Sequence, residues 1–300
     1  MNIFKKKCNK IDGIYVDESF DDTTKKVADF YKKNPFPNYK NYDNKSTILL
    51  KGNESYLKSL KELMGYKKMI LEVGCGTGQF SNYFAIGTNN SIFALDPTIE
   101  SLKIAKNFSD RNNVKNITYI NGSIFEEIFE NETFDFVFCS GVLHHTKDTH
   151  LGFKNCVKLL KKNGFILIGL YNSYAKFSLR RFIFKIFGYK FISKIDPILK
   201  NLKDSDQEIT AWVEDQYNHP VERSHSIDEV LQWFRDNRIE PIAGIPKINN
   251  LDLYDINMKI IDNTPIVSKN WFSRIITQLN MNFNLLGSDG SLFCILGRKK

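Results

Sequence analysis

The 300-residue sequence is poor in cysteine, with five, and in tryptophan, with three. Cys75, Cys139, Cys156 and Cys294 fall in or beside apolar segments, and no two cysteines stand at the spacing of metal ligands or of a redox pair. Cysteines used in this way are typical of buried, reduced thiols. We therefore expect no disulfide framework and no metal site.

Long apolar runs are also missing. The uncharged, largely apolar stretch at residues 163–175 is too short to span a bilayer. Lys5–Lys7 near the amino terminus are not followed by the apolar run of a secretory signal. These absences favour a cytoplasmic protein.

The positive net charge is not confined to one part of the chain. The 42 Lys and Arg outnumber the 34 Asp and Glu, which gives a net charge of +8, but the excess lysines are spread along the chain. Such a distribution leaves a polyanion-binding surface open as an alternative and does not favour it. The 42% hydrophobic and 25% charged content is ordinary for a globular chain with a sizeable core.

A glycine-rich turn is the most informative stretch present. Residues 71–78 read Leu-Glu-Val-Gly-Cys-Gly-Thr-Gly, between an apolar run and a helical pattern. Glycine allows positive φ and the close approach of a ligand to the backbone. Gly78 is followed by Gln79 rather than by Lys-Ser/Thr, which excludes a phosphate loop, and Gly78 comes one residue too early for a dinucleotide fingerprint.

An acid follows at the next strand. Asp96 ends the apolar run 92–95, 20 residues after Gly76. Because neighbouring parallel strands end at the same sheet edge, the carboxylate should lie beside the glycine turn, where it can accept from two sugar hydroxyls. Glu72, the glycines and Asp96 together resemble motif I and the ribose-binding acid of the class I S-adenosylmethionine (SAM)-dependent methyltransferases.

This resemblance implies SAM as cofactor and S-adenosylhomocysteine as product. Where the family usually has Gly-Asp to bind the adenine amino group, this chain has Gly122-Ser123, and a hydroxyl can accept the same bond more weakly. The cofactor-binding residues implied are Glu72, Gly74, Cys75, Gly76, Thr77, Gly78, Asp96, Pro97, Ser123, Ile124 and Ser140.

The pattern after the glycine turn alternates strand and helix, which favours a parallel sheet. We expect helices from about residue 98, at 151–162 and at 226–238, and strands at 69–71, 92–96, 117–120, 134–140, 165–170, 241–245 and 291–296. The expected fold is an α/β, Rossmann-like, doubly wound seven-stranded sheet, mainly parallel with an antiparallel last strand. Residues 67–300 would form the catalytic domain, with insertions at about 171–225 and 246–290.

Residues 1–66 would form an arm and cap. Residues 1–20 read as a loosely held arm, a helix begins near Asp21, and 46–66 reads as another helix. Aromatic residues before motif I often cover the cofactor in this family, and Tyr31, Phe36, Tyr39 and Tyr42 are candidates for such a lid, with Tyr31 and Tyr39 as substrate-binding residues. The alternative is a proline-pinned strap packed on the core.

Two histidines follow the strand at 134–140. The sequence Val142-Leu-His144-His145 is similar to a loop common in small-molecule methyltransferases that resemble the quinone-biosynthesis enzymes. Imidazoles at a strand's carboxyl end suit a general base near neutral pH. The alternative is that His144 and His145 cap the next helix and hold the loop.

We expect substrate-binding residues in the first insertion, because insertions at this edge of the sheet form the walls of the crevice where ligands bind. Tyr171 and Asn172 are candidates by position alone. Tyr217, His219 and Glu222 belong to a polar, titratable loop, with Tyr217 and His219 as catalytic candidates, His219 as a possible base, and Glu222 as a substrate contact. The basic aromatic segment 174–194 is compatible with membrane-surface contact, an anionic or lipid-like substrate, or a lid helix.

We therefore expect transfer of a methyl group from SAM to an O or N atom of a small-molecule acceptor, by direct displacement with proton removal and without a metal. Two alternatives stay open: a nucleic-acid methyltransferase that uses the basic segment, and a non-catalytic SAM-fold interaction module. The sequence leaves the acceptor and the oligomeric state open.

Overall fold

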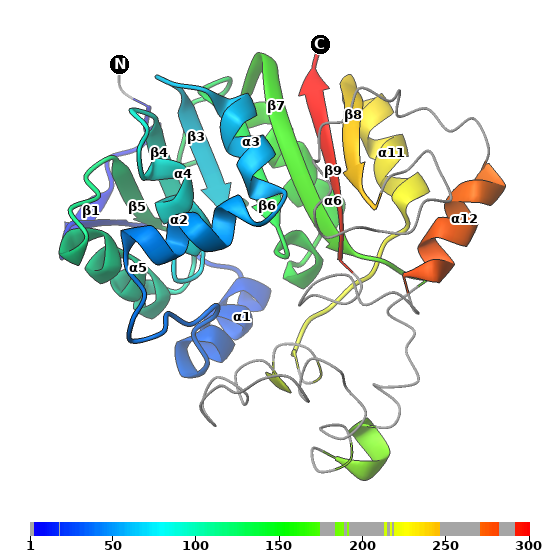
Figure 1. Ribbon diagram of the computed structural model, residues 1–300, viewed down its shortest axis with the longest axis horizontal. Coiled ribbons are helices and arrows are strands. Elements are labelled where there is room, and N and C mark those ends of the chain that lie inside the picture. Colours follow the sequence, from blue (N-terminus) through cyan, green and yellow to red (C-terminus); the bar gives the residue numbers. More distant parts are fainter. Residues whose placement is uncertain are drawn as a thin grey trace.

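A computed structural model describes residues 3–17, 19–174, 184–188, 191, 213–214, 217, 219–246, 271–281 and 292–300. Its centre is a mixed sheet of nine strands with helices on both faces (Figure 1). The elements are, in chain order, β1 Asn9–Ile11, β2 Ile14–Val16, α1 Asp22–Lys33, α2 Lys45–Asn53, α3 Leu57–Met64, β3 Met69–Val73, α4 Gln79–Ala85, β4 Ser91–Asp96, α5 Ile99–Arg111, β5 Ile117–Asn121, β6 Phe134–Ser140, η1 Leu143–His145, α6 Thr149–Leu159, β7 Leu160–Tyr171, α11 Ile227–Asp236, β8 Ile239–Ile245, α12 Trp271–Asn280 and β9 Leu292–Lys299.

The strand order is β1-β2-β5-β4-β3-β6-β7-β9-β8. The strands from β5 to β7 pair in parallel, and β9 is antiparallel to both of its neighbours, β7 and β8. This confirms the mainly parallel sheet with an antiparallel last strand. The order reverses at β3, so the crevice beyond the carboxyl ends of β3 and β6 is where this architecture places a ligand.

The expected count of seven strands is wrong, because the arm adds two more. β1 and β2 form an antiparallel pair, and Tyr15 and Val16 pair in parallel with Ile120 and Asn121 of β5. Ile14 is fully buried in a small core with Leu102 and Ala105 of α5, among others. Burial of this side chain, together with the backbone pairing, holds the segment that the sequence predicted to be loose.

Two larger cores lie on the two faces of the sheet. One joins Leu71, Val73 and their strand neighbours to α6 and α11, and the other joins Ile70, Phe136 and Phe138 to α2, α3 and α4. Consecutive residues of the central strands point to opposite faces, and both faces are covered, which is why these strands are apolar throughout.

Two predicted helices have different bounds. Residues 46–66 form α2 and α3, with a break after Asn53. Gly52, near the end of α2, lies so close to the ring of Tyr83 that a Cβ at this position would overlap the ring. The packing of α2 on α4 therefore requires a glycine here. The helix predicted to reach residue 162 ends at Leu159, because Leu160 pairs with Phe134 and begins β7.

Much of both insertions lies outside the described residues. Within the basic aromatic segment, the structure describes residues 174, 184–188 and 191, so the interpretations of that segment are not tested. α12, which the sequence analysis did not predict, lies in the second insertion. Among the described helices, none combines the length and the apolar character required to cross a bilayer.

Candidate active site

A cavity of about 380 Å³ lies beyond the carboxyl ends of the central strands. Its walls come from β3, β4, β6 and β7 and the loops that follow them, while α1 lies across this edge of the sheet (Figure 1). Thirteen residues singled out from the sequence line it: Tyr31, Phe36, Glu72, Gly74, Cys75, Gly76, Asp96, Pro97, Ser123, Ile124, Ser140, His145 and Tyr171.

The backbone of the glycine turn bonds to the protein itself. The N–H groups of Gly74 and Cys75 donate to the carbonyl of Leu95 at 2.7 and 3.1 Å, and that of Gly76 donates to Asp96 Oδ2 at 2.8 Å. The N–H groups of the next two residues donate to the carbonyls of Phe36 and Cys75. These amides are therefore occupied, and the turn does not offer the cluster of N–H groups with which a phosphate loop binds an anion.

Packing explains the three glycines, which all have positive φ. A Cβ at Gly74 would overlap Val142, one at Gly76 would overlap the Phe36 carbonyl, and one at Gly78 would come within 2.7 Å of Ala105 Cβ. Protein atoms occupy the Cβ positions, so packing within the protein also requires glycine here; Gly74 and Gly76 line the cavity, and the close approach of a ligand to them stays a prediction. Gly78 begins α4 and does not line the cavity.

Thr77 is also placed away from the cavity. Its hydroxyl donates to the carbonyl of Pro37, and its N–H donates to the Phe36 carbonyl at 3.4 Å. This residue therefore binds the proline-containing strap, residues 34–44, to the glycine turn, rather than binding a ligand.

Asp96 is held rigidly at the end of β4. Its two carboxylate oxygens accept from the backbone N–H groups of Gly76 and Thr98, both at 2.8 Å. The side chain lines the cavity and is 7% exposed. Burial raises the pKa of this carboxyl, and the two backbone bonds oppose that rise.

Glu72 is a second buried acid in the same wall. It is 2% exposed, and the hydroxyl of Ser81 in α4 donates to its carboxylate. Burial raises the pKa of Glu72 to about 8, and the nearby Asp96 charge adds to the rise. Among the described lining residues there is no Lys or Arg, so the cavity holds two acids without a matching protein cation.

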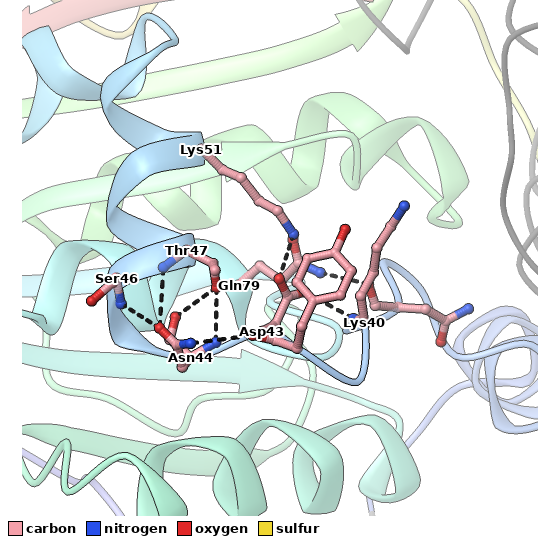
Figure 2. Close-up of polar contacts among 9 residues, drawn as sticks. Lys40, Asp43, Asn44, Ser46, Thr47, Lys51 and Gln79 are labelled. Atoms are coloured by element: carbon pink, nitrogen blue, oxygen red, sulfur yellow. Dashed lines mark hydrogen bonds and ion pairs between the residues drawn. The ribbon is translucent and has the colours of Figure 1, made fainter.

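The strap and α1 form the outer wall. Thr24, Val27 and Tyr31 of α1 line the cavity together with Phe36 and Pro37 of the strap. Strap residues are tied down further along. Asn44 accepts from the backbone N–H groups of Ser46 and Thr47 at the start of α2 (Figure 2). Lys51 pairs with Asp43, and the two charged atoms are 2.7 Å apart.

Tyr39 of the strap does not reach the cavity. Its ring stacks on Phe108 at 4.2 Å, and its hydroxyl accepts from the side chain of Asn82 at 3.2 Å. Tyr42 is 63% exposed. Of the lid candidates, Tyr31 and Phe36 therefore line the cavity, while Tyr39 anchors the strap on the core; that these residues form a lid stays a prediction.

Three histidines cluster beside the cavity, and one of them lines it. His145 Nδ1 lies 2.7 Å from the carbonyl oxygen of Val221, which can only accept, so this nitrogen carries the hydrogen. Nε2 is then the basic nitrogen of the neutral ring. The ring of His219 stacks on His145 with centroids 3.6 Å apart, on the side of α1.

Other predicted site residues lie outside the wall. His144 is fully buried, with its ring between those of His145 and Tyr171, at 4.2 and 4.1 Å. His219 packs behind His145, and Tyr217 contacts Phe184 at 4.8 Å. None of His144, His219, Tyr217 or Glu222 lines the cavity, so direct catalytic or substrate contacts for them are not borne out.

Asn172 is a tertiary anchor rather than a substrate contact. It is fully buried, and its amide donates to the Gln278 carbonyl at 3.2 Å and to the sulfur of Met281 at 3.0 Å. It thereby ties the end of β7 to α12, while the adjacent Tyr171 points to the cavity.

The sequence analysis missed several lining residues: Thr24, Val27, Tyr56, Gln79, Phe80, Thr98, Ser101, Val142, Thr146 and Leu292. Thr24, Val27 and Tyr31 follow a helical i, i+3, i+7 spacing, and this signal could have found the α1 residues. Ser101 is 1% exposed, and within the described part of the chain its hydroxyl has no hydrogen-bond partner.

Comparison with known families agrees with this geometry. Residues 71–168, from the glycine turn into β7, match the family described as a methyltransferase domain. The fold and the site define a class I SAM-dependent methyltransferase domain, whose cofactor is SAM.

Among characterised proteins, the chain is similar to ubiquinone biosynthesis O-methyltransferases. It is 28% identical over 137 residues to that of Glaesserella parasuis, which covers 44% of this chain and 56% of the relative. It is 27% identical over 169 residues to that of Coxiella burnetii, which covers 54% and 68%. The chain thus spans little more than half the length of the first of these relatives.

Solved structures show the fold alone. The [4+2]-cyclase SpnF matches with a TM-score of 0.51 and 11% identity, over 92% of this chain and 96% of the cyclase. A chain from the complex containing the Haloferax volcanii Trm112 methyltransferase activator matches with a TM-score of 0.50 and 14% identity, over 93% and 98%. The likeness to a cyclase illustrates that this fold does not determine the reaction.

The residues present fit SAM, which carries a positive sulfonium and an ammonium group. Two buried carboxyls without a lining Lys or Arg favour a cation over an anion. The unpartnered hydroxyl of Ser101 near Asp96 offers a further polar group for a nucleoside. In the described part of the chain, no group of three or more His, Cys, Asp or Glu side chains is placed to hold a metal.

Proposed function

We propose that the protein transfers a methyl group from SAM to an oxygen or nitrogen atom of a small-molecule acceptor, with removal of a proton from that atom. The observation that supports this most is the position of His145. It lines the same cavity as Glu72 and Asp96, and its Nδ1 is held by the Val221 carbonyl. When bound, SAM would supply a methyl group on a positively charged sulfur; the acceptor's lone pair would form a bond to the methyl carbon, the bond from that carbon to sulfur would break, and S-adenosylhomocysteine would leave.

Different residues of the cavity would bind the methyl donor and accept the proton. Asp96, Glu72 and Ser101 would hold the donor, and Ser123 lies in the same wall for its base. His145 Nε2 would take the proton from the acceptor hydroxyl or amine. The aromatic rings of Tyr31, Phe36 and Tyr171 and the absence of a lining Lys or Arg among the described residues support an uncharged, partly apolar acceptor over an anionic one.

Labelled methyl transfer tests the proposal. The protein would be incubated with methyl-labelled SAM and separate sets of neutral phenols, amines and carboxylic acids. We expect labelled product from a phenol or an amine, and a rate for His145→Gln lower by roughly 100-fold at pH 7. With a phenol, the loss should shrink toward pH 10, where the acceptor ionises by itself.

His150→Gln is the matched control, because His150 stacks on Trp233 outside the cavity wall. It should retain the wild-type rate. Failure of the wild-type protein to bind SAM in calorimetry, or an unchanged rate for His145→Gln, would refute the proposal. The nucleic-acid alternative depended on the basic segment 176–194, and the few described residues there provide no observation in its favour.

A further inference from the structure

One backbone carbonyl lies against two imidazoles. The Nδ1 atoms of His145 and His219 are 2.7 and 2.6 Å from the oxygen of Val221. A carbonyl oxygen has two lone pairs and can accept from both. The His145 ring then carries its hydrogen on Nδ1, and its Nε2 is basic in the neutral state. Nδ1 of His219 also lies 3.2 Å from the N–H of Val221, which can donate to it, so the contacts of this ring fit either tautomer.

His219 also connects this arrangement to the cap helix. Its ring contacts Phe30 and Tyr31 of α1, with centroids 4.9 and 5.6 Å apart, and it stacks on His145 at 3.6 Å. Phe30, His219 and His145 therefore form a continuous row of packed rings from the surface of α1 to the cavity wall. Side chains in such contact move together, because a shift of one leaves a void or an overlap at the next.

The segment that carries His219 and Val221 is fixed on its other side. The N–H of Arg223 donates to the His144 carbonyl at 2.8 Å, and its guanidinium donates to the carbonyl of Thr146. Near the start of α1, Lys147 pairs with Asp21 at 3.2 Å. The loop after β6, the segment 219–223 and α1 thus meet around the two imidazoles.

We propose that His219 is a positioning residue that transmits the placement of α1 to His145 and thereby fixes Nε2 of His145 as the proton acceptor. The inference rests on the proposed function, since a fixed acceptor nitrogen matters only if a proton is removed in this cavity. It assigns His219, which does not line the cavity, a role that acts through another residue.

Nitrogen NMR of ¹⁵N-histidine-labelled protein tests the inference without a methyl acceptor. The chain has five histidines, so His145 can be assigned from the signals lost in His145→Gln. At about pH 8.5, where an ordinary imidazole is neutral, we expect Nδ1 of His145 to be protonated and Nε2 unprotonated. In Phe30→Ala and His219→Phe, both resonances should shift toward a mixture of tautomers.

The two substitutions should not be additive. If the coupling passes through His219, Phe30→Ala should shift the His145 resonances in the wild-type background and cause no further shift in His219→Phe. Lys26→Ala, at an exposed position of the same helix, is the control and should leave the spectrum unchanged. Should His219→Phe fail to fold, Phe30→Ala against Lys26→Ala still decides the question.

A His145 that carries its hydrogen on Nε2 in the wild-type protein would overturn the inference, as would a Phe30→Ala spectrum identical to the wild type. Calorimetric titration of the same samples with SAM separates the two proposals. If the wild-type protein does not bind SAM, the proposed function is refuted. If it binds SAM but the tautomer of His145 is unchanged in the Phe30→Ala and His219→Phe variants, only the coupling is refuted.

Discussion

At the scale of single residues, the two buried acids distinguish this site. Glu72 and Asp96 stand in an enclosed wall where an ionised carboxyl loses hydration, and the protein supplies hydroxyl and backbone N–H donors in place of a cation. With a pKa of about 8, the Glu72 carboxyl is mostly protonated near pH 7 when no ligand is bound, and a positively charged ligand beside it would favour its ionised form.

Substitution of Glu72 should change how stability depends on pH. The pKa of Glu72 in the folded protein, about 8, lies above its ordinary value near 4.5, so the folded state binds this proton more tightly than the unfolded state does. The stability that Glu72 contributes is therefore complete below about pH 4.5 and is lost as the pH rises to about 8.

We therefore expect Glu72→Gln, without cofactor, to unfold at a higher temperature than the wild type at pH 8, by an amount that shrinks toward pH 5. Thermal unfolding followed by circular dichroism across pH 5–8 measures this. The same variant should bind SAM more weakly. An equal difference in unfolding temperature at all pH values would contradict the assigned pKa.

Asp96→Asn should damage both the turn and the donor site. The amide replaces one of the two acceptor oxygens by an NH₂ group that faces a backbone N–H, which leaves that donor unpaired at a cost of about 1–3 kcal/mol. SAM affinity, measured by calorimetry, should fall at least about tenfold. Asp110→Asn, on the exposed i, i+4 pair with Lys106, is the control and should change the free energy of unfolding by less than about 0.5 kcal/mol.

At the scale of elements, the strap and the glycine turn act as one unit. The strap carbonyls of Phe36 and Pro37 accept from Thr77, and that of Asn38 accepts from Gln79 at 2.9 Å. The glycine turn, which bounds the donor site, therefore also holds the segment that covers it.

A pair of glycine substitutions separates this packing from backbone strain. Gly76 and Gly87 have positive φ values of 52° and 74°, but a Cβ would overlap the Phe36 carbonyl at the first and meet nothing within 4 Å at the second. Gly87→Ala should cost only about 1 kcal/mol for the backbone conformation. Gly76→Ala should cost clearly more, weaken SAM binding, and increase proteolytic cleavage within residues 34–44. Equal effects of the two substitutions would show that the strap is not held by this contact.

At the scale of the whole molecule, the amino-terminal arm extends the sheet by two strands. The parallel pairing of β2 with β5 puts Ile14 over α5, so the arm contributes to the core beneath the donor site.

Ile14→Ala should therefore destabilise the protein by about 2–4 kcal/mol, since it removes a fully buried side chain. Ile11→Ala, only three residues away and 47% exposed, should cost less than about 0.5 kcal/mol. Urea unfolding of the two variants measures the difference. Similar small effects at both positions would restore the interpretation of a loose arm.

The sequence by itself determined the central sheet, the glycine turn and the pairing of that turn with Asp96. These features are local in origin: runs of apolar residues, glycines at alternate positions, and the rule that parallel strands end at one edge. Glu72, Ser123 and His145 could be found for the same reason, because each stands at or near the end of a recognisable strand.

Only the tertiary structure decided which of the remaining candidates face the cavity. Tyr31 and Tyr39 are both aromatic residues of the segment before the glycine turn, yet Tyr31 lines the cavity and Tyr39 packs on the core. Likewise, His145 lines the cavity, whereas its neighbour His144 packs behind it. The arm forms two strands, and the burial of Ile14 against α5 stabilises them. Such choices depend on contacts between residues distant in the chain, and no local pattern records them, because burial is a property of the packed molecule.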